Sequence, residues 1–335
     1  MHSAGTKGRL NIFDVGPRFG STKLAAAAIR GALTLAAISA LLLIGARSAQ
    51  AQNSATSDDG SEPAVVHNTW SSGAPLPVGA VEGPAIGVIG KNIYLAGGSG
   101  STATEIYNTK TNTWSAGAAI PSGGDWGTGA VVDGILYFIG SRTEVMAYDP
   151  VTDAWTTGLA SMPTARDSLS AVVDKGIIYV IGGFNGSRVA TVESYNPATD
   201  TWTKEAPMLV GKSLPGVGLL GATIVAASGL GNSGWTGDNE GYTVKKNKWK
   251  TLAADPNPRS NGCSGSIAGK LYFAGGVLNY NPVGVVESYS LKTNSWTTLA
   301  PIPQATDYPG SAVVGGRLYC IGGAGGVGYT QIYQP

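Results

Sequence analysis

The sequence predicts an all-β protein, and three observations support this prediction. Charged residues make up only 13% of the chain, whereas there are 50 Gly, 8 Trp and 14 Tyr residues. Disordered chains have the opposite composition, with high charge and few aromatic residues. Short apolar runs separated by Gly-rich turns are typical of β-strands. A tryptophan also recurs along the chain at a nearly constant interval.

The tryptophan repeat divides most of the chain into similar units. The successive intervals are 44, 41, 47, 47 and 47 residues, and five of the six tryptophans follow a Tyr by seven positions. Self-similarity at such a period predicts structural units that stack against their neighbours. The repeated tryptophans are Trp70, Trp114, Trp155, Trp202, Trp249 and Trp296.

A hydrophobic strand that ends in a pair of small residues precedes each Tyr. The clearest copy runs from Ile177 to Gly183, and related copies run from Ile93 to Gly98, from Leu271 to Gly276 and from Leu318 to Gly323. Two units depart from this pattern, because they end in Gly140-Ser141 and Ser228-Gly229. Paired glycines suit a sharp turn close to a neighbouring backbone.

These features resemble the kelch repeat, which has a diglycine after its second strand, a Tyr in its third and a Trp in its fourth. The resemblance covers about residues 65–335 in six copies. It implies a six-bladed kelch-type β-propeller in which each repeat forms one four-stranded blade. Stacking fits the physics of such units, because neighbouring blades bury each other's faces and leave only short edges.

The two ends of the repeat region predict how the ring closes. The last copy stops at Tyr333-Gln334-Pro335, whereas Asn68-Thr69-Trp70 stands alone before the first copy. We expect the first strand, from about Val65 to Trp70, to complete the last blade beside Tyr333. The closed propeller, residues 65–335, is then a single domain.

The first 51 residues have the order of a secretory signal peptide. Five basic residues precede an apolar run from Gly31 to Ala46, and Ala49-Gln50-Ala51 has the small-x-small form of a cleavage site. We expect cleavage after Ala51, a secreted or periplasmic protein, and a flexible linker over residues 52–64. The apolar run is shorter than a membrane span of about 20 residues, so we expect no span in the mature chain. A retained anchor and an organelle transit peptide remain open.

The charge balance argues against nucleic-acid binding. The leader holds six of the 22 basic residues and one of the 21 acids, so the mature chain has 16 and 20 and a net charge of −4. Nucleic-acid binders carry basic patches. A cluster formed by Lys245, Lys246, Lys248 and Lys250 is predicted to be a solvated hairpin tip.

Cysteine and histidine are both scarce. The sequence leaves open whether Cys263 and Cys320 are paired, because two well-separated cysteines form no recognisable framework. Outside the leader there is one histidine, His67, which argues against a His-activated triad and against the usual zinc ligands. It also excludes the chemistry of the copper oxidases that share kelch-type propellers. We expect no metal and no cofactor.

The candidate site is a column of residues in the loops that enter the first strand of each unit. We expect these residues to ring the mouth of the central channel, because the first strand of a propeller blade is innermost. Loops on a rigid scaffold commonly carry binding residues. Counting back twelve positions from the Tyr of strand two, or its equivalent, gives Glu82, Asp125, Asp167, Ser213, Ser260 and Asp307. The neighbouring positions add Arg166, Lys212 and Arg259 on one side and Trp126, Asn261 and Tyr308 on the other.

From this column we select nine candidate ligand-binding residues. A structural interpretation stays open for some of them, because arginines near the start of strand one can position loops and neighbouring charges can form ion pairs. The loops after the diglycines could add a rim of Arg142, Phe184, Arg188, Trp235, Tyr280 and Tyr329. The selected residues are Glu82, Asp125, Trp126, Arg166, Asp167, Arg259, Asn261, Asp307 and Tyr308.

We predict an exported, monomeric binding module that recognises a carbohydrate or a protein or peptide partner at this face. The resemblance supports it, since kelch propellers are generally interaction platforms. The alternative is a metal-independent sugar-modifying enzyme resembling the kelch sialic-acid mutarotases, in which carboxylates would transfer protons and arginines would hold an acidic sugar. The compact repeats favour binding over catalysis, and no catalytic residue is assigned. A structural part of a cell-envelope assembly is the second alternative.

Overall fold

The computed structural model describes residues 67–335, except residues 80, 99, 123, 125, 141 and 325–327. The predicted signal peptide (1–51) and linker (52–64) lie outside the described residues. One compact unit spans Pro63–Pro335. In the described part of this unit, the regular secondary structure consists of strands and one 3-10 turn, η1 (Val244–Lys246). The all-β prediction is therefore confirmed. Among these residues no helix has the length and hydropathy needed to cross a membrane.

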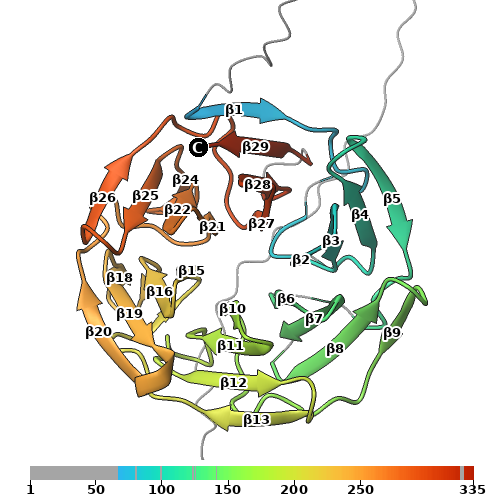
Figure 1. Cartoon of the computed structure of the whole chain (residues 1–335), viewed down its shortest axis with the longest axis horizontal. Coiled ribbons are helices and arrows are strands. Elements are labelled where there is room, and N and C mark those ends of the chain that lie inside the picture. Colours follow the sequence, from blue (N-terminus) through green and yellow to red (C-terminus); the bar gives the residue numbers. More distant parts are fainter. Residues whose placement is uncertain are drawn as a thin grey trace, which may run out of the picture. The chain divides into compact units, whose positions relative to one another are not determined.

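Six four-stranded antiparallel sheets surround a common centre (Figure 1). Sheet one contains β2 (Ala85–Ile89), β3 (Asn92–Ala96), β4 (Thr104–Asn108) and β5 (Thr113–Gly117), and sheet two contains β6 (Thr128–Val132), β7 (Ile135–Gly140), β8 (Glu144–Asp149) and β9 (Ala154–Thr156). Sheet three contains β10 (Ser170–Asp174), β11 (Ile177–Ile181), β12 (Val192–Asn196) and β13 (Thr201–Lys204), and sheet four contains β15 (Gly216–Leu220), β16 (Thr223–Ala227), β19 (Asn239–Thr243) and β20 (Lys248–Leu252). Sheet five contains β21 (Cys263–Ile267), β22 (Lys270–Ala274), β25 (Val286–Ser290) and β26 (Ser295–Thr298), and sheet six contains β27 (Gly310–Val314), β28 (Arg317–Ile321), β29 (Thr330–Gln334) and β1 (Thr69–Ser72).

Two small sheets lie in the loops of sheets four and five. In the first, β17 (Leu230–Gly231) pairs with β14 (Lys212–Ser213) on one side and with β18 (Gly234–Trp235) on the other. In the second, β23 (Val277–Leu278) pairs with β24 (Asn281–Pro282). The four clustered lysines lie on η1 and β20 at the opposite end of sheet four, and all four side chains are exposed.

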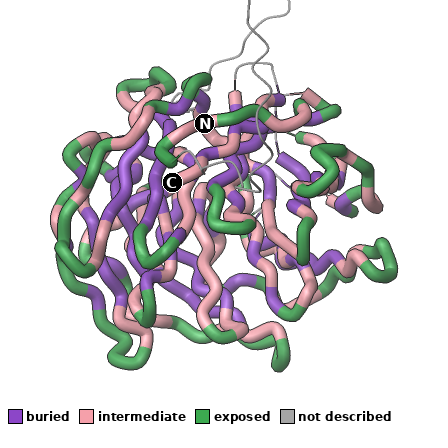
Figure 2. The backbone as a smooth tube through the Cα atoms, turned by 45° about the horizontal axis from the view of Figure 1, so that its top comes forward, coloured by how far each residue is buried: buried purple, intermediate pink, exposed green. Residues whose placement is uncertain are grey.

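Burial is greatest in the second and third strands of each sheet and least in the outermost strand (Figure 2). In sheet three, four of the five residues of β11 are buried, whereas three of the four residues of β13 are exposed. Ile178 and Val180 of β11 pack against Ile139 and Val145 of sheet two. The innermost strands β2, β6, β10, β15, β21 and β27 each contact the next, and β27 contacts β2. The core is therefore a series of sheet-to-sheet interfaces rather than one central cluster.

A repeated hydrogen-bond unit, which we call the clasp, ties each sheet to its predecessor. In sheet three, the Tyr195 hydroxyl donates to Asp200 (2.6 Å), the Ala160 amide donates to the same carboxylate (2.8 Å), and Trp202 Nε1 donates to the Ala160 carbonyl (2.8 Å). Asp200 has a left-handed backbone, with φ of 51°, which Asp and Asn tolerate better than other non-Gly residues. The Tyr and Trp of each repeat are thus structural.

Sheet six has the same clasp, but part of it comes from the other end of the chain. Asn68 accepts hydrogen bonds from the Tyr333 hydroxyl (2.7 Å) and the Ala300 amide (2.8 Å). Trp70 Nε1 donates to the Ala300 carbonyl (3.0 Å). Strand β1 pairs with β29, with Trp70 opposite Tyr333.

Cys263 and Cys320 form a buried disulfide that joins sheets five and six. The two residues belong to β21 and β28 and are 57 positions apart in the chain. The bond settles the pairing that the sequence left open. It fastens the sheet that contains both ends of the described chain to its neighbour.

Reduction of this disulfide is expected to lower the free energy of unfolding by about 4 kcal/mol, because a closed loop of this length restricts the unfolded chain. Urea unfolding with and without dithiothreitol measures the difference. A Cys263→Ala/Cys320→Ala variant serves as the control and should not respond to the reductant. Equal midpoints for the oxidised and reduced protein would contradict the prediction.

Candidate functional site

One residue from each sheet forms a ring at the mouth of the central channel. All six have a left-handed backbone, with φ between 52° and 60°. They immediately follow the column of carboxylates and serines identified in the sequence. We call this set the mouth ring; its members are Gly83, Trp126, Ser168, Leu214, Asn261 and Tyr308.

Backbone hydrogen bonds connect successive members of the mouth ring. Five links are recorded, with N···O distances of 2.8 to 3.3 Å. For example, the Ser168 amide donates to the Trp126 carbonyl, and the Gly83 amide donates to the Tyr308 carbonyl. Because neighbouring sheets supply the donor and the acceptor, the ring holds its side chains in fixed positions relative to one another.

The diglycine loops lie beside the loops that carry the mouth ring. The Gly183 amide donates to the Lys212 carbonyl of the next sheet (3.0 Å). A Cβ placed on Gly182 would lie 2.2 Å from the Lys212 carbonyl oxygen, so this position requires glycine. We call the face that carries the mouth ring and the diglycine loops the mouth face.

A cavity of about 170 Å³ lies at the mouth ring and along the innermost strands. Its walls are mostly backbone and small side chains, and it includes Asn261 and Tyr308 of the ring. Serine hydroxyls connect neighbouring strands there: Ser170 Oγ donates to the Pro215 carbonyl (2.9 Å), and the Ser264 amide donates to Ser311 Oγ (3.0 Å). The channel wall is therefore uncharged, and the titratable groups lie around its mouth.

The structure places the two predicted arginines inside the protein, which differs from the expectation that they converge at the mouth. Arg166 is 1% exposed and forms an ion pair with Glu193 of β12. Its Nε donates to the Gly182 carbonyl (2.8 Å) and its Nη1 to the Thr164 carbonyl (3.0 Å). Desolvation lowers the pKa of this guanidinium, although Glu193 opposes the shift. The neighbouring Asp167 is not its partner.

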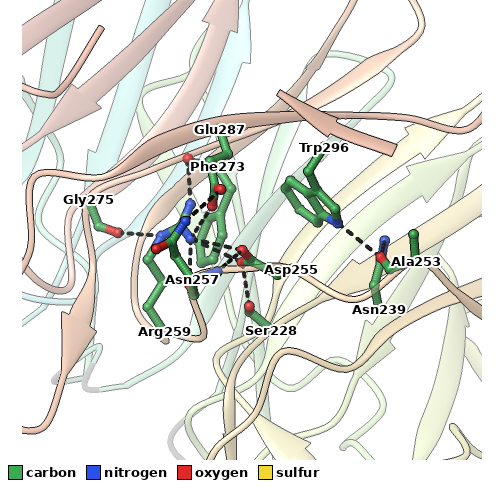
Figure 3. A network of polar contacts seen from close by, with 10 residues as sticks. All are labelled: Ser228, Asn239, Ala253, Asp255, Asn257, Arg259, Phe273, Gly275, Glu287 and Trp296. Atoms are coloured by element: carbon green, nitrogen blue, oxygen red, sulfur yellow. Dashed lines mark hydrogen bonds and ion pairs between the residues drawn. The ribbon is translucent and has the colours of Figure 1, made fainter. Parts of the chain in front are cut away.

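Arg259 has the same arrangement in sheet five, with one additional carboxylate (Figure 3). Its Nη1 lies 3.0 Å from Asp255 Oδ2 and 2.7 Å from Glu287 Oε2, and its guanidinium lies over the Phe273 ring at 4.3 Å. Ser228 of sheet four donates a hydrogen bond to Asp255 (2.5 Å). Burial and the neighbouring Asp255 raise the pKa of Glu287.

Lys212 completes the series in sheet four, where its Nζ lies 3.3 Å from Glu240. The corresponding pair in sheet six is Thr306 and Gln331, which is neutral, and Thr306 Oγ1 donates to the Gly322 carbonyl (3.3 Å). The buried cations therefore satisfy strand-end carbonyls and a carboxylate on the third strand. The sequence contained a signal for these carboxylates, since Glu stands two residues before the Tyr of the third strand in four repeats.

Two aromatic residues of the mouth ring come together across sheet one. The rings of Trp126 and Tyr308 are 4.9 Å apart between centroids and nearly perpendicular. Gly83 stands between them in the mouth ring, and a Cβ built there would be in ordinary van der Waals contact with the indole, 3.8 Å away. The indole remains 38% exposed. This aromatic pair forms an accessible apolar surface at the mouth.

Two carboxylates flank the aromatic pair. The pKa of Asp307 is raised by burial, although its own amide and that of Ala324 oppose the shift. The pKa of Glu82 is raised by burial and by Asp307. Burial also raises the pKa of Tyr308; a hydrogen bond with the Asn261 side chain opposes this shift, and both carboxylates add to it. Glu82, Asp307 and Tyr308 thus lie within electrostatic reach of one another.

The two remaining candidate ligand-binding residues are Asp167 and Asp125. Asp167 lies on the mouth face of sheet three, where its carboxylate accepts a hydrogen bond from Ser168 (2.9 Å). Asp125 lies outside the described residues. Across the described ranges no group of three or more His, Cys, Asp or Glu is arranged to hold a metal ion.

A second aromatic group lies on the rim over sheets three to five. Arg188 lies over the Phe184 ring at 5.2 Å, and Trp235 meets Tyr280 with ring centroids 5.0 Å apart. Tyr280 is 88% exposed. The rim is thus a second aromatic surface, formed by the diglycine loops of sheets three to five.

Comparisons with known proteins agree with the repeat pattern. The family model described as "Kelch motif" matches residues 165–209 and 258–303. These segments contain sheets three and five, in which the buried arginine and the carboxylate on the third strand are both present.

Two curated relatives are the Kelch-like protein 23 of Pongo abelii and that of Homo sapiens. Each is 27% identical over 133 residues, which cover 36% of this chain and 24% of the relative. The chain therefore matches about a quarter of the length of these relatives. A solved structure, "Structure of YjhT", aligns with a TM-score of 0.68 at 21% identity and covers 76% of this chain and 94% of the neighbour. At this identity the similarity concerns the fold.

Proposed function

The chain is a kelch-repeat protein, and from this premise we propose that it is a binding module whose ligand lies on the mouth face. In this proposal the six sheets are the blades of a closed propeller, and β1 completes the last blade. The leader exports the protein, and the buried Cys263–Cys320 disulfide supports this destination, because disulfides persist outside the reducing cytosol.

The observation that carries the proposal is the aromatic pair at the mouth. Trp126 and Tyr308 come from sheets two and six, and both are held by a hydrogen-bonded ring with carboxylates beside them. Aromatic rings with polar tips supply much of the contact area in recognition sites. A carbohydrate could stack on the indole, and an extended peptide could continue from the mouth to the rim at Tyr280.

A thermal-shift screen of the protein against defined sugars and defined peptides tests the proposal. A ligand at about 100 times its Kd adds about 2.7 kcal/mol of stability, which shifts Tm by several degrees. We expect any such shift to be lost in Trp126→Ala and kept in Val151→Ser, a control on the β8–β9 turn at the opposite end of the sheet. A shift that survives in Trp126→Ala would place the ligand elsewhere.

A second candidate function is metal-independent proton transfer on a bound sugar. It is favoured by Glu82 and Asp307, because carboxyl groups with raised pKa can act as acid and base. An acidic sugar is less favoured than a neutral one, since Arg166 and Arg259 are engaged in the interior. NMR exchange between anomers of a bound sugar, compared with the Asp307→Asn variant, distinguishes this activity from binding alone.

A further inference from the structure

Two buried oxygen atoms at the mouth have no hydrogen-bond partner. They are Oδ1 of Asp307 and Oδ1 of Asn261. Asn261 is only 8% exposed and lines the cavity together with Tyr308. A buried polar atom without a hydrogen-bond partner destabilises the folded protein. Both atoms are hydrogen-bond acceptors. A ligand bound at the mouth beside them therefore gains most by bringing hydrogen-bond donors.

Two carboxylates, those of Glu82 and Asp307, lie near these acceptors. Asp307 lies close enough to disfavour ionisation of Glu82, and both carboxylates disfavour ionisation of the Tyr308 hydroxyl. The ion pairs recorded between described side chains involve Arg166, Lys212 and Arg259, and all three of these cations are buried with carboxylates of the interior. None of these pairs includes Asp307. The loops that enter strand one therefore bring carboxylates to the mouth and keep their cations inside.

The aromatic pair also favours a positively charged ligand at the mouth. The faces of Trp and Tyr rings attract cations, and this attraction is stronger where water is excluded. The exposed indole of Trp126 lies against Tyr308, which is itself next to Asp307 in the chain. A cation bound beside the Trp126–Tyr308 pair would contact a ring face and the Asp307 carboxylate at once.

We propose that the mouth binds a protonated primary amine, with Asp307 and Asn261 accepting its hydrogen bonds and the Trp126–Tyr308 pair packing against its carbon chain. An ammonium group has three donors, no acceptor and a positive charge, which matches the unpaired acceptors, the carboxylates and the rings. A neutral hydroxyl satisfies only the acceptors, and an anionic ligand is repelled. The proposal rests on the mouth face being the binding face.

An amino sugar and a lysine side chain share this chemistry, and matched probes separate the two sources. Glucosamine is compared with N-acetylglucosamine, and N-acetyl-lysine amide with the same compound acetylated on Nζ. Binding to the protein is measured by isothermal titration calorimetry and by the shift of the Trp126 indole N–H in NMR spectra. We expect the charged member of one pair to bind at least tenfold more tightly than its neutral partner. The pair that shows the larger ratio identifies the source.

Two variants connect this selectivity to named groups. Asp307→Asn keeps an acceptor and removes the charge, so it should abolish the preference for the charged probe and lower its affinity at least tenfold. Glu82→Gln should lower the preference in the same direction, and melting curves verify that both variants are folded. Val151→Ser, on the opposite end, should leave both affinities unchanged.

The outcomes separate this inference from the proposed function. Equal or weaker binding of the charged probes, or an unchanged preference in Asp307→Asn, overturns the amine proposal. If another ligand still binds in a Trp126-dependent way, the mouth face remains the binding face. If charged probes bind but Trp126→Ala and Asp307→Asn have no effect, the mouth face is wrong and both proposals fail.

Discussion

Deleting residues 67–72 is expected to lower the free energy of unfolding by about 5 kcal/mol or more. The deletion removes β1, the Trp70–Tyr333 contact and the clasp donor to Ala300, and it leaves β29 as an unpaired edge. Loss of a fully buried Trp side chain costs about 3–5 kcal/mol, and the deletion removes the half-buried Trp70 together with a whole paired strand. Since a whole domain is stable by only about 5–15 kcal/mol, we expect much of the protein to unfold at 25 °C. Urea unfolding followed by tryptophan fluorescence gives the measurement.

A pair of point variants makes this test sharper. Trp114 forms the same clasp as Trp70, donating to Ala74 at 2.9 Å, but both partners come from one continuous stretch of chain. If the N-terminal strand is a full member of the last blade, Trp70→Ala and Trp114→Ala should cost similar amounts. A cost for Trp70→Ala below about 1 kcal/mol would show that β1 is only loosely attached, and it would contradict the proposed closure.

Replacing Arg259 with Thr is expected to cost about 3–5 kcal/mol, because Asp255 and Glu287 then remain buried without a cation. The neutral pair of sheet six offers a matched control. The triple variant Arg259→Thr/Glu287→Gln/Asp255→Asn copies its uncharged character and should recover much of the loss. If the triple variant is as unstable as the single one, packing of the guanidinium on Phe273, and not charge, determines the cost.

The same variant should respond to pH in a defined direction. The folded-state pKa of Glu287 is already raised, so this group favours the folded state when protonated, and the contribution is lost as pH rises through the folded pKa. Arg259 is the charge that lowers this pKa, and its removal raises the pKa further. The deficit of Arg259→Thr relative to wild type should therefore shrink from neutral to mildly acidic pH. A deficit that is constant with pH would contradict this account.

The sequence predicted the parts of the structure that depend on local repetition. In five of the six clasps the Tyr and the Trp belong to one continuous repeat, so their constant spacing is visible in the sequence. The six left-handed residues of the mouth ring likewise occupy one aligned column. Arg166 and Arg259 were expected at the mouth because the sequence showed only their place at a loop. Their inward direction depends on carboxylates of the third strand, about 27 residues later.

Contacts between repeats were harder to predict than contacts within them. Cys263 and Cys320 pair only because β21 and β28 lie side by side in neighbouring sheets. Trp126 and Tyr308 come from two different repeats, and Gly83 of a third repeat stands between them in the mouth ring. The sequence of one repeat does not determine which residues of the neighbouring repeats it contacts. Such pairs are therefore seen only in the three-dimensional structure.

The pairing of β1 with β29 determines how the protein would respond to mechanical force. Thr69 lies opposite Gln334 and Ser72 opposite Gln331, so the two chain ends leave this strand pair on the same side. A pull between the ends therefore loads its hydrogen bonds one after another, as in a zipper, rather than all together in shear. Once this pair opens, the covalent link between Cys263 and Cys320 keeps the segment between them from extending. Stretching under oxidising conditions should thus stop short of the full contour length.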